Sequence, residues 1–133
     1  MRPFGGHVPG PTLILVHGAA TLNTVYWRAD RSHRFCGRMT DLLGAREGDA
    51  ILFGHTHMPW TRGFNGRTLV NAGSAGRPSD GDPRGGYAIV DMRDGIDVTF
   101  PRVRYNLERT AAALATAGLP PELGTILRSG GSL

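Results

Sequence analysis

The sequence contains no lysine, only one cysteine and no long apolar stretch. All fifteen basic side chains are arginines, set against eleven acidic ones, and the formal net charge is +4. The single cysteine, Cys36, excludes an internal disulfide. No segment approaches the roughly 20 apolar residues that a membrane span needs, and residues 1–6 lack the apolar core of a secretory signal. These absences favour a cytoplasmic protein with no membrane partner.

The arginines are scattered along the chain and do not gather in a cluster. A basic balance without a patch or a stacking aromatic series argues against nucleic acid as the main partner. It is compatible with a small anionic substrate such as a phosphate ester.

A length of 133 residues indicates a single domain, residues 1–133, with a modest core. Apolar runs and turn signals predict its elements in order. They are a strand at 12–16, a helix at 32–43 with a cap within Asp30-Arg31-Ser32, a strand at 50–53, a hairpin of 58–64 and 67–70 around Asn65-Gly66, a loop at 71–86, a hairpin of 87–92 and 96–100 around Asp94-Gly95, a helix at 107–117 capped by Asn106, and a last helix from Pro120-Pro121 to about Arg128.

Three histidines follow two of the predicted buried strands. His17 comes directly after the strand at 12–16, and Gly54-His55-Thr56-His57 follows the strand at 50–53. If the second strand stays extended beyond Gly54, His55 and His57 project to the same face, because side chains alternate along a strand. Neutral imidazoles bind divalent transition metals well. The pattern therefore predicts a metal site at the strand ends.

Three motifs in register resemble one protein family. They are Val16-His17-Gly18, then Gly54-His55-Thr56-His57 followed by Met58-Pro59, and the loop from Val70-Asn71-Ala72-Gly73-Ser74 to Pro78. Together they resemble the C-terminal half of a calcineurin-like metallophosphoesterase of the small bacterial phosphodiesterase type, over about residues 12–92. The resemblance implies an α/β fold. It would be part of a four-layer sandwich with a mixed sheet, its N-terminal half missing, and residues 103–133 would form a helical extension.

The resemblance also implies a dinuclear metal centre that hydrolyses a phosphodiester or a phosphomonoester. In such families His17 and His55 would bind one divalent ion and His57 the other, with Mn, Fe, Zn or Ni as candidates. The nucleophile would be a metal-bound water, so no side chain is assigned as catalytic. No residue is assigned to substrate binding.

The chain departs from the family because the carboxylate motifs that bridge the metals are missing. No Asp-x-His or Asn-His string occurs, and Gly48-Asp49 and Gly81-Asp82 stand at unmatched positions. Four explanations stay open: a piece of a longer chain, a misplaced start codon, a decayed gene product, or an assembly in which another chain completes the sheet. We expect a homo-oligomer or pairing with a missing N-terminal half. A catalytically inactive half-domain acting as an interaction module is the alternative function.

The remaining candidate residues are predicted to be structural. His7 and His33 are expected on the surface or in loops, Trp27 in the core, and Cys36 as a small core or surface residue. Trp60 is expected to pack, with the substrate mouth as an alternative. The same predictions give Arg77 and Arg84 loop-ordering ion pairs and Asp80 and Asp82 turn roles.

Overall fold

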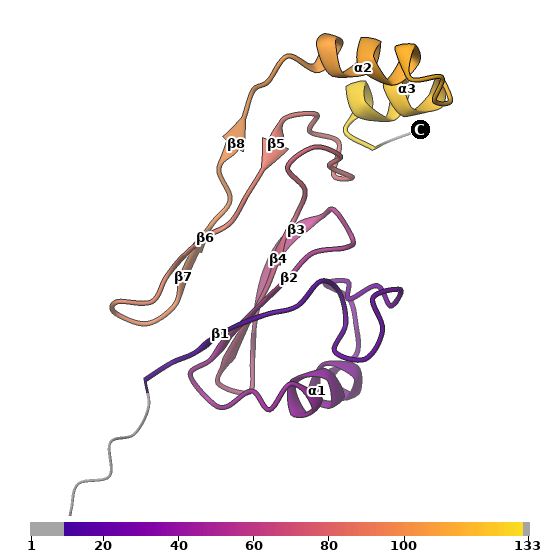
Figure 1. The fold of residues 1–133 in the computed structure, drawn as a ribbon. Coiled ribbons are helices and arrows are strands. Elements are labelled where there is room, and N and C mark those ends of the chain that lie inside the picture. Colours follow the sequence, from indigo (N-terminus) through magenta and orange to yellow (C-terminus); the bar gives the residue numbers. More distant parts are fainter. Residues whose placement is uncertain (1–9, 132–133) are drawn as a thin grey trace, which may run out of the picture.

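The computed structural model describes residues 10–131, so the prediction for His7 lies outside it. Its central element is a four-stranded sheet in the order β1-β2-β4-β3 (Figure 1). The strands are β1 (Leu13–Leu15), β2 (Ala50–Phe53), β3 (Pro59–Phe64) and β4 (Arg67–Ala72). β1, β2 and β4 run parallel, whereas β3 is antiparallel to β4. The sheet is therefore mixed, as predicted.

The hairpin of β3 and β4 is closed by Asn65 and Gly66, with φ values of 45° and 71°. Both central residues thus adopt the positive φ of a type I′ turn, whose twist matches that of the flanking strands. The pairing Phe64↔Arg67 confirms the two-residue connection. This turn sets the register that carries Trp60 opposite Asn71.

Helix α1 (His33–Leu42) covers one face of the sheet. Ser32 caps it, because its hydroxyl oxygen accepts a hydrogen bond from the Phe35 backbone N–H at 3.2 Å. Cys36 and Met39 on α1 belong to one apolar core with sheet residues such as Ile51 and Leu69. The predicted helix is confirmed, and of the two positions left open for Cys36 the structure shows the core.

Trp27 anchors the segment between β1 and α1 to this core. It is fully buried, and its ring stacks on Phe53 with centroids 4.4 Å apart and planes 9° from parallel. Its predicted packing role is confirmed. Because Phe53 is the last residue of β2, this contact holds the segment around Trp27 beside the histidine-rich turn that follows the strand.

The other face of the sheet lies towards a long two-stranded ribbon (Figure 1). Its tip is β6 (Ile89–Asp91) paired with β7 (Asp97–Thr99), and its base is β5 (Gly85–Gly86) paired with β8 (Arg102–Val103). The tip confirms the predicted second hairpin. The loop predicted at 71–86 was partly wrong, because β4 runs to Ala72 and Gly85–Gly86 pair with β8. Glycine pairs carry no apolar alternation, so sequence pattern could not reveal β5.

β1 lies at the edge of the four-stranded sheet, and its apolar side chains are not fully covered. Leu15 is 66% exposed and Leu13 is 40% exposed, although both belong to a strand of three apolar residues. An open edge combined with exposed apolar side chains is a common site for strand pairing with another chain. Within residues 10–131, no helix has the length and apolar character needed to cross a bilayer.

The chain ends in helices α2 (Leu107–Thr116) and α3 (Glu122–Ser129), which pack against each other at the far end of the ribbon. Asn106 caps α2 by accepting from the Arg109 backbone N–H at 2.9 Å. The end of α3 contacts the loop before β5, where the Gly81 N–H donates to the Gly130 carbonyl at 3.0 Å. These contacts join the C-terminal helices to the loop that follows β4.

A substitution at Gly130 will show how much that junction stabilises the fold. Gly130 has φ 68°, and a Cβ there would lie 2.6 Å from backbone atoms of Gly81 and Asp82. We expect Gly130→Ala to lower the free energy of unfolding by about 2–4 kcal/mol, from the left-handed backbone plus overpacking. Gly118→Ala is the matched control, because Gly118 has φ 69° with nothing within 4 Å. If urea unfolding shows that Gly130→Ala and Gly118→Ala lose equal free energies of unfolding, the contact of Gly130 with the loop does not stabilise the fold.

Asp49 joins the beginnings of β1 and β2 and gives a pH-dependent prediction. Burial acts to raise the pKa of its carboxyl group, but hydrogen bonds from the backbone N–H groups of Arg46 and Thr12 outweigh it and hold that pKa below its usual value. Those bonds measure 2.7 and 2.8 Å. A lowered folded-state pKa means that the stabilisation is complete above about pH 4 and is lost as the pH falls further.

We therefore expect Asp49→Asn to cost about 2 kcal/mol at pH 7, because the amide cannot accept from both N–H groups. The loss relative to the unsubstituted protein should shrink as the pH falls below about 4, because the unfolded chain then binds a proton at Asp49 that the folded chain resists. Asp41→Asn, at an exposed position on α1, is the control for the change in charge. Denaturant titrations between pH 3 and 7 test this, and a loss that does not vary with pH would contradict it.

A candidate metal centre at the strand ends

His17 and His55 meet because β1 and β2 are parallel neighbours that end at the same edge of the sheet. The Val16 N–H donates to the Leu52 carbonyl, and the Gly54 N–H donates to the His17 carbonyl, each at 3.0 Å. This ladder continues past both strands and brings the two rings together. His17 Nε2 lies 3.2 Å from His55 Nδ1, and the ring centroids are 5.1 Å apart.

The backbone after β2 is not extended, so the predicted alternation of His55 and His57 was wrong. β2 ends at Phe53, and His55 and His57 have φ values of 66° and 60°. A left-handed conformation is uncommon for a residue other than glycine and costs about 1–2 kcal/mol. Two such residues in one turn indicate a locally strained segment, of the kind that gathers at functional sites.

Asn71 holds this turn in place from β4. It is fully buried, and its Nδ2 donates to the Gly54 carbonyl and to Thr56 Oγ1, both at 2.9 Å. Its Oδ1 accepts from the Gly73 N–H at 3.0 Å. One amide thus links the end of β2, the histidine turn and the loop after β4. The sequence placed Asn71 in a motif of the resembled family but did not indicate this role for its side chain.

His57 is held through its backbone by the loop that follows β4. Its carbonyl accepts from the Ser79 N–H at 3.1 Å. In the part of the chain that the structure describes, no three His, Cys, Asp or Glu side chains form a group that could hold a metal ion. The structure therefore brings His17 and His55 together and does not place His57 in a common group with them.

The paired nitrogens fit two ligands of one cation. Nitrogen ligands about 2.1 Å from a tetrahedral or octahedral ion lie about 3.0–3.4 Å apart, which includes the observed 3.2 Å. The same distance allows a direct hydrogen bond in which one ring donates and the other accepts. His55 Nε2 is buried and has no hydrogen-bond partner among residues 10–131. Metal-bound histidines usually donate a hydrogen bond from that second nitrogen. In a complete metal centre, His55 Nε2 would therefore need an acceptor from outside residues 10–131.

Tyr26 lies against the histidine pair and Arg28 lies against Tyr26, and sequence reasoning missed both. The Tyr26 ring contacts the His55 ring with centroids 4.5 Å apart. The Arg28 guanidinium lies over the Tyr26 ring, 5.7 Å from its centroid. Their segment lies between β1 and α1 and carries no motif. Only the apolar Trp27 between them hints that the segment is anchored, and the sequence alone does not say where.

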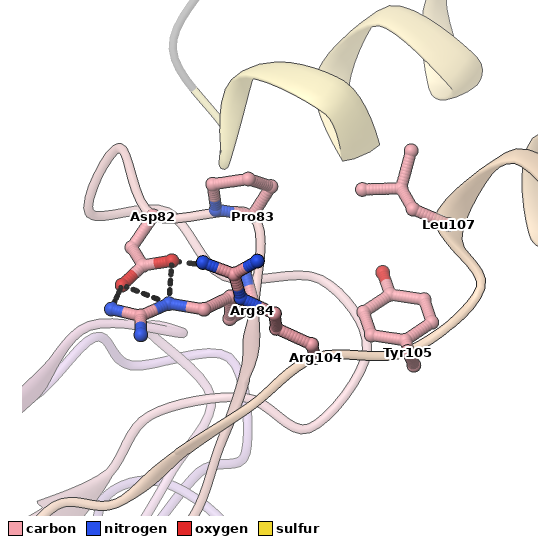
Figure 2. Close-up of a pocket in the computed structure, with 6 residues that line it drawn as sticks. All are labelled: Asp82, Pro83, Arg84, Arg104, Tyr105 and Leu107. Atoms are coloured by element: carbon pink, nitrogen blue, oxygen red, sulfur yellow. Dashed lines mark hydrogen bonds and ion pairs between the residues drawn. The ribbon is translucent and has the colours of Figure 1, made fainter.

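Arg84 orders its loop through an ion pair, as predicted, whereas among residues 10–131 Arg77 forms no ion pair and only its backbone N–H bonds, to Ser74 Oγ at 2.9 Å. A hollow of about 370 Å³ lies between the loop before β5 and the start of α2, lined by Asp82, Pro83, Arg84, Arg104, Tyr105 and Leu107 (Figure 2). Arg84 binds Asp82 at 2.6 Å. The hydrogen bond from its side chain holds the pKa of the half-buried Asp82 carboxyl well below its usual range. The turn roles of Asp80 and Asp82 are confirmed, because each accepts from a backbone N–H two residues on.

Comparison with known proteins identifies the family. Residues 7–95 match the calcineurin-like phosphoesterase superfamily domain, and the chain belongs to this family. Members of this family are in general metal-dependent phosphoester hydrolases that use divalent metal ions. The resemblance predicted from the three motifs is confirmed.

Individual relatives are longer than this chain. It is 28% identical to a metallophosphoesterase from Sphaerobacter thermophilus of known crystal structure, with a TM-score of 0.71 over 92% of this chain and 56% of that one. A hypothetical protein from Pyrococcus horikoshii shares the fold at 20% identity and a TM-score of 0.73, covering 90% of this chain and 46% of its own. An uncharacterised protein from Methanocaldococcus jannaschii is 30% identical over 92 residues, 58% of this chain and 37% of its own length.

Proposed function

We propose that the protein hydrolyses phosphate esters, either phosphodiesters or phosphomonoesters, with two divalent metal ions held in part by His17, His55 and His57. The observation that supports this most is the 3.2 Å approach of two imidazole nitrogens at the ends of β1 and β2, in a chain of a metal-dependent phosphoesterase family. Manganese, iron, zinc and nickel all suit imidazole ligands.

The chain's own residues would position the ester and the ions. Bound divalent ions would polarise the phosphate and supply an activated water near neutral pH. His17 and His55 would hold one ion, while His57 would face the second. Asn71 would keep the turn between them fixed, because its two donated bonds end on Gly54 and Thr56. A fixed ligand set lowers the cost of organising the site during the reaction.

Carboxylates to complete the site would come from a second polypeptide segment. Among residues 10–131 there is no acidic group near enough to make a group of three with the two histidines. β1 offers an open edge beside them, with Leu15 66% exposed. We propose that another copy of the chain, or a segment equivalent to the unmatched part of the longer relatives, pairs at this edge.

The open edge of β1 and the lack of a nearby acidic group among residues 10–131 also favour one alternative function. A half-domain with an open edge and no carboxylates would act as an interaction or assembly module without catalysis. It would bind its partner through β1 and hold metal weakly or not at all. Hydrolysis by the purified chain distinguishes the two functions.

The experiment is Mn²⁺-dependent hydrolysis of bis(4-nitrophenyl) phosphate and of 4-nitrophenyl phosphate, combined with size-exclusion chromatography. We expect an oligomer to carry out the hydrolysis. His55→Ala should lower the rate at least about 100-fold, as does removal of other groups that stabilise a transition state. His33→Ala should leave the rate unchanged. His33 is exposed and bonds to Asn65 at 3.3 Å, away from the pair. Leu15→Asp should shift the oligomer towards monomer. A metal-independent rate, or a rate unchanged by His55→Ala, would contradict the proposal.

A further inference from the structure

An apolar cleft of about 290 Å³ opens directly beside the histidine turn. Its lining includes Thr56, Met58, Pro59 and Trp60 from one side and Arg28 and Asp30 from the other. Thr56 and Met58 flank His57 in the chain, so one wall of the cleft is the same turn that carries the candidate ligands. Met58 is 47% exposed although it is apolar, and an exposed apolar side chain at a cleft beside a reactive centre commonly contacts a ligand.

The opposite wall is rigidly attached to the core. Trp27 stacks on Phe53, and Arg62 from β3 donates to the Ala29 carbonyl at 2.8 Å. Arg31 Nε donates to the Tyr26 carbonyl at 2.9 Å. Because its backbone is held at Tyr26 and at Ala29, the segment 26–30 forms a preorganised wall of the cleft. The cleft therefore exists before any ligand binds, which lowers the entropy cost of binding.

The charges at the cleft favour an anion beside an apolar group. Arg28 forms no ion pair with any carboxylate within residues 10–131, and it lies over the Tyr26 ring that also contacts His55. Asp30 lies on the same rim. The guanidinium of Arg28 is thus separated from the histidine pair by a single aromatic side chain. A phosphate held by the metal centre would be near a positive charge that no carboxylate within residues 10–131 pairs with, and it would have an apolar cleft next to it.

We infer that this cleft selects phosphate esters that carry an aromatic or similarly flat apolar group. The organic group lies against Met58 and Trp60, and Arg28 contacts the phosphate from the rim. The inference rests on the proposed function, because it places the phosphate at the histidine pair. It adds a substrate class and two specificity-determining residues, Arg28, which lies outside the three motifs, and Met58, which stands between His57 and Pro59.

The test compares the binding of two non-hydrolysable probes, phenylphosphonate and methylphosphonate, to the full chain by calorimetry, with and without Mn²⁺. Phenylphosphonate should bind about tenfold more tightly, from partial burial of its ring. Met58→Ala should lower the affinity for phenylphosphonate about threefold to tenfold and leave methylphosphonate unchanged. Met58 is exposed, so this variant should fold.

Arg28→Gln should lower the affinity for both phosphonates about tenfold, because a charge-assisted hydrogen bond is lost and Asp30 is left to repel the anion. Arg38→Gln, at an exposed position on α1, removes the same charge as a control and should change neither affinity. Equal affinities for the two probes, or equal effects of Arg28→Gln and Arg38→Gln, would overturn the inference. Absence of any effect of Mn²⁺ on binding would instead count against the proposed function, so the two failures are distinguishable.

Discussion

Replacing either His17 or His55 by alanine will lower the affinity of the protein for Mn²⁺ at least about tenfold. The two nitrogens face each other at 3.2 Å, so each substitution removes one of two converging ligands. Losing even a group that only supports a ligand typically costs 10–100-fold in metal affinity, and loss of a ligand costs no less. Isothermal titration calorimetry or electron paramagnetic resonance of free Mn²⁺ measures the effect.

His33→Ala is the control for this experiment. It removes a histidine that lies on α1 and contacts Phe64 and Asn65, not the strand ends. We expect its Mn²⁺ affinity to equal that of the unsubstituted chain. An equal loss for all three variants would mean that binding is nonspecific, and no loss for His17→Ala and His55→Ala would show that these two histidines do not bind Mn²⁺.

Replacing Asn71 by alanine will destabilise the protein by about 3 kcal/mol and weaken Mn²⁺ binding together. The substitution removes the Asn71 partner of the Gly54 carbonyl, of the Gly73 N–H and of Thr56 Oγ1, which keeps only its bond from the Met58 N–H at 3.4 Å, and a polar group left unpaired inside the protein costs about 1–3 kcal/mol. The histidine turn also loses the bond that offsets its left-handed backbone. Urea unfolding and a Mn²⁺ titration at a temperature where the variant is folded test the two effects.

Asn106→Ala serves as the comparison, because it also removes an asparagine side chain that bonds to backbone. Asn106 caps α2, and loss of an N-cap costs about 1 kcal/mol. We expect that variant to lose stability without any change in metal affinity. If Asn71→Ala loses stability but keeps full Mn²⁺ affinity, Asn71 supports the fold and does not position the histidines.

Local sequence signals predicted most of the elements but not the shape of the site. Ser32, Asn65-Gly66 and Asn106 each fix their element through bonds to near neighbours, and all three appear where the sequence placed them. The two apolar runs placed His17 and His55 at strand ends, and the family resemblance implied that the two belong together. The conformation at His55 and His57 did not follow, because alternation assumes an extended chain and a distant residue, Asn71, stabilises the turn instead.

The cleft beside the site was beyond the reach of sequence reasoning for a similar reason. Tyr26 and Arg28 come near the histidines only because Trp27 stacks on Phe53, a contact between residues 26 positions apart. No motif records such packing, since any buried aromatic residue would give the same apolar signal. For Trp60 the sequence offered two roles, packing or lining a substrate mouth. The structure shows its ring packed against Phe53 and its side chain in the lining of the cleft.

The most direct test of the metal centre is a long-range ¹H–¹⁵N spectrum of the ¹⁵N-histidine-labelled protein during titration with Zn²⁺. If the centre is as described, one equivalent of Zn²⁺ will shift the resonances of His17 Nε2 and His55 Nδ1 and leave His33 unchanged. Unshifted rings at positions 17 and 55, with the pair retaining the signature of a direct imidazole–imidazole hydrogen bond, would show that these histidines serve the fold and hold no metal.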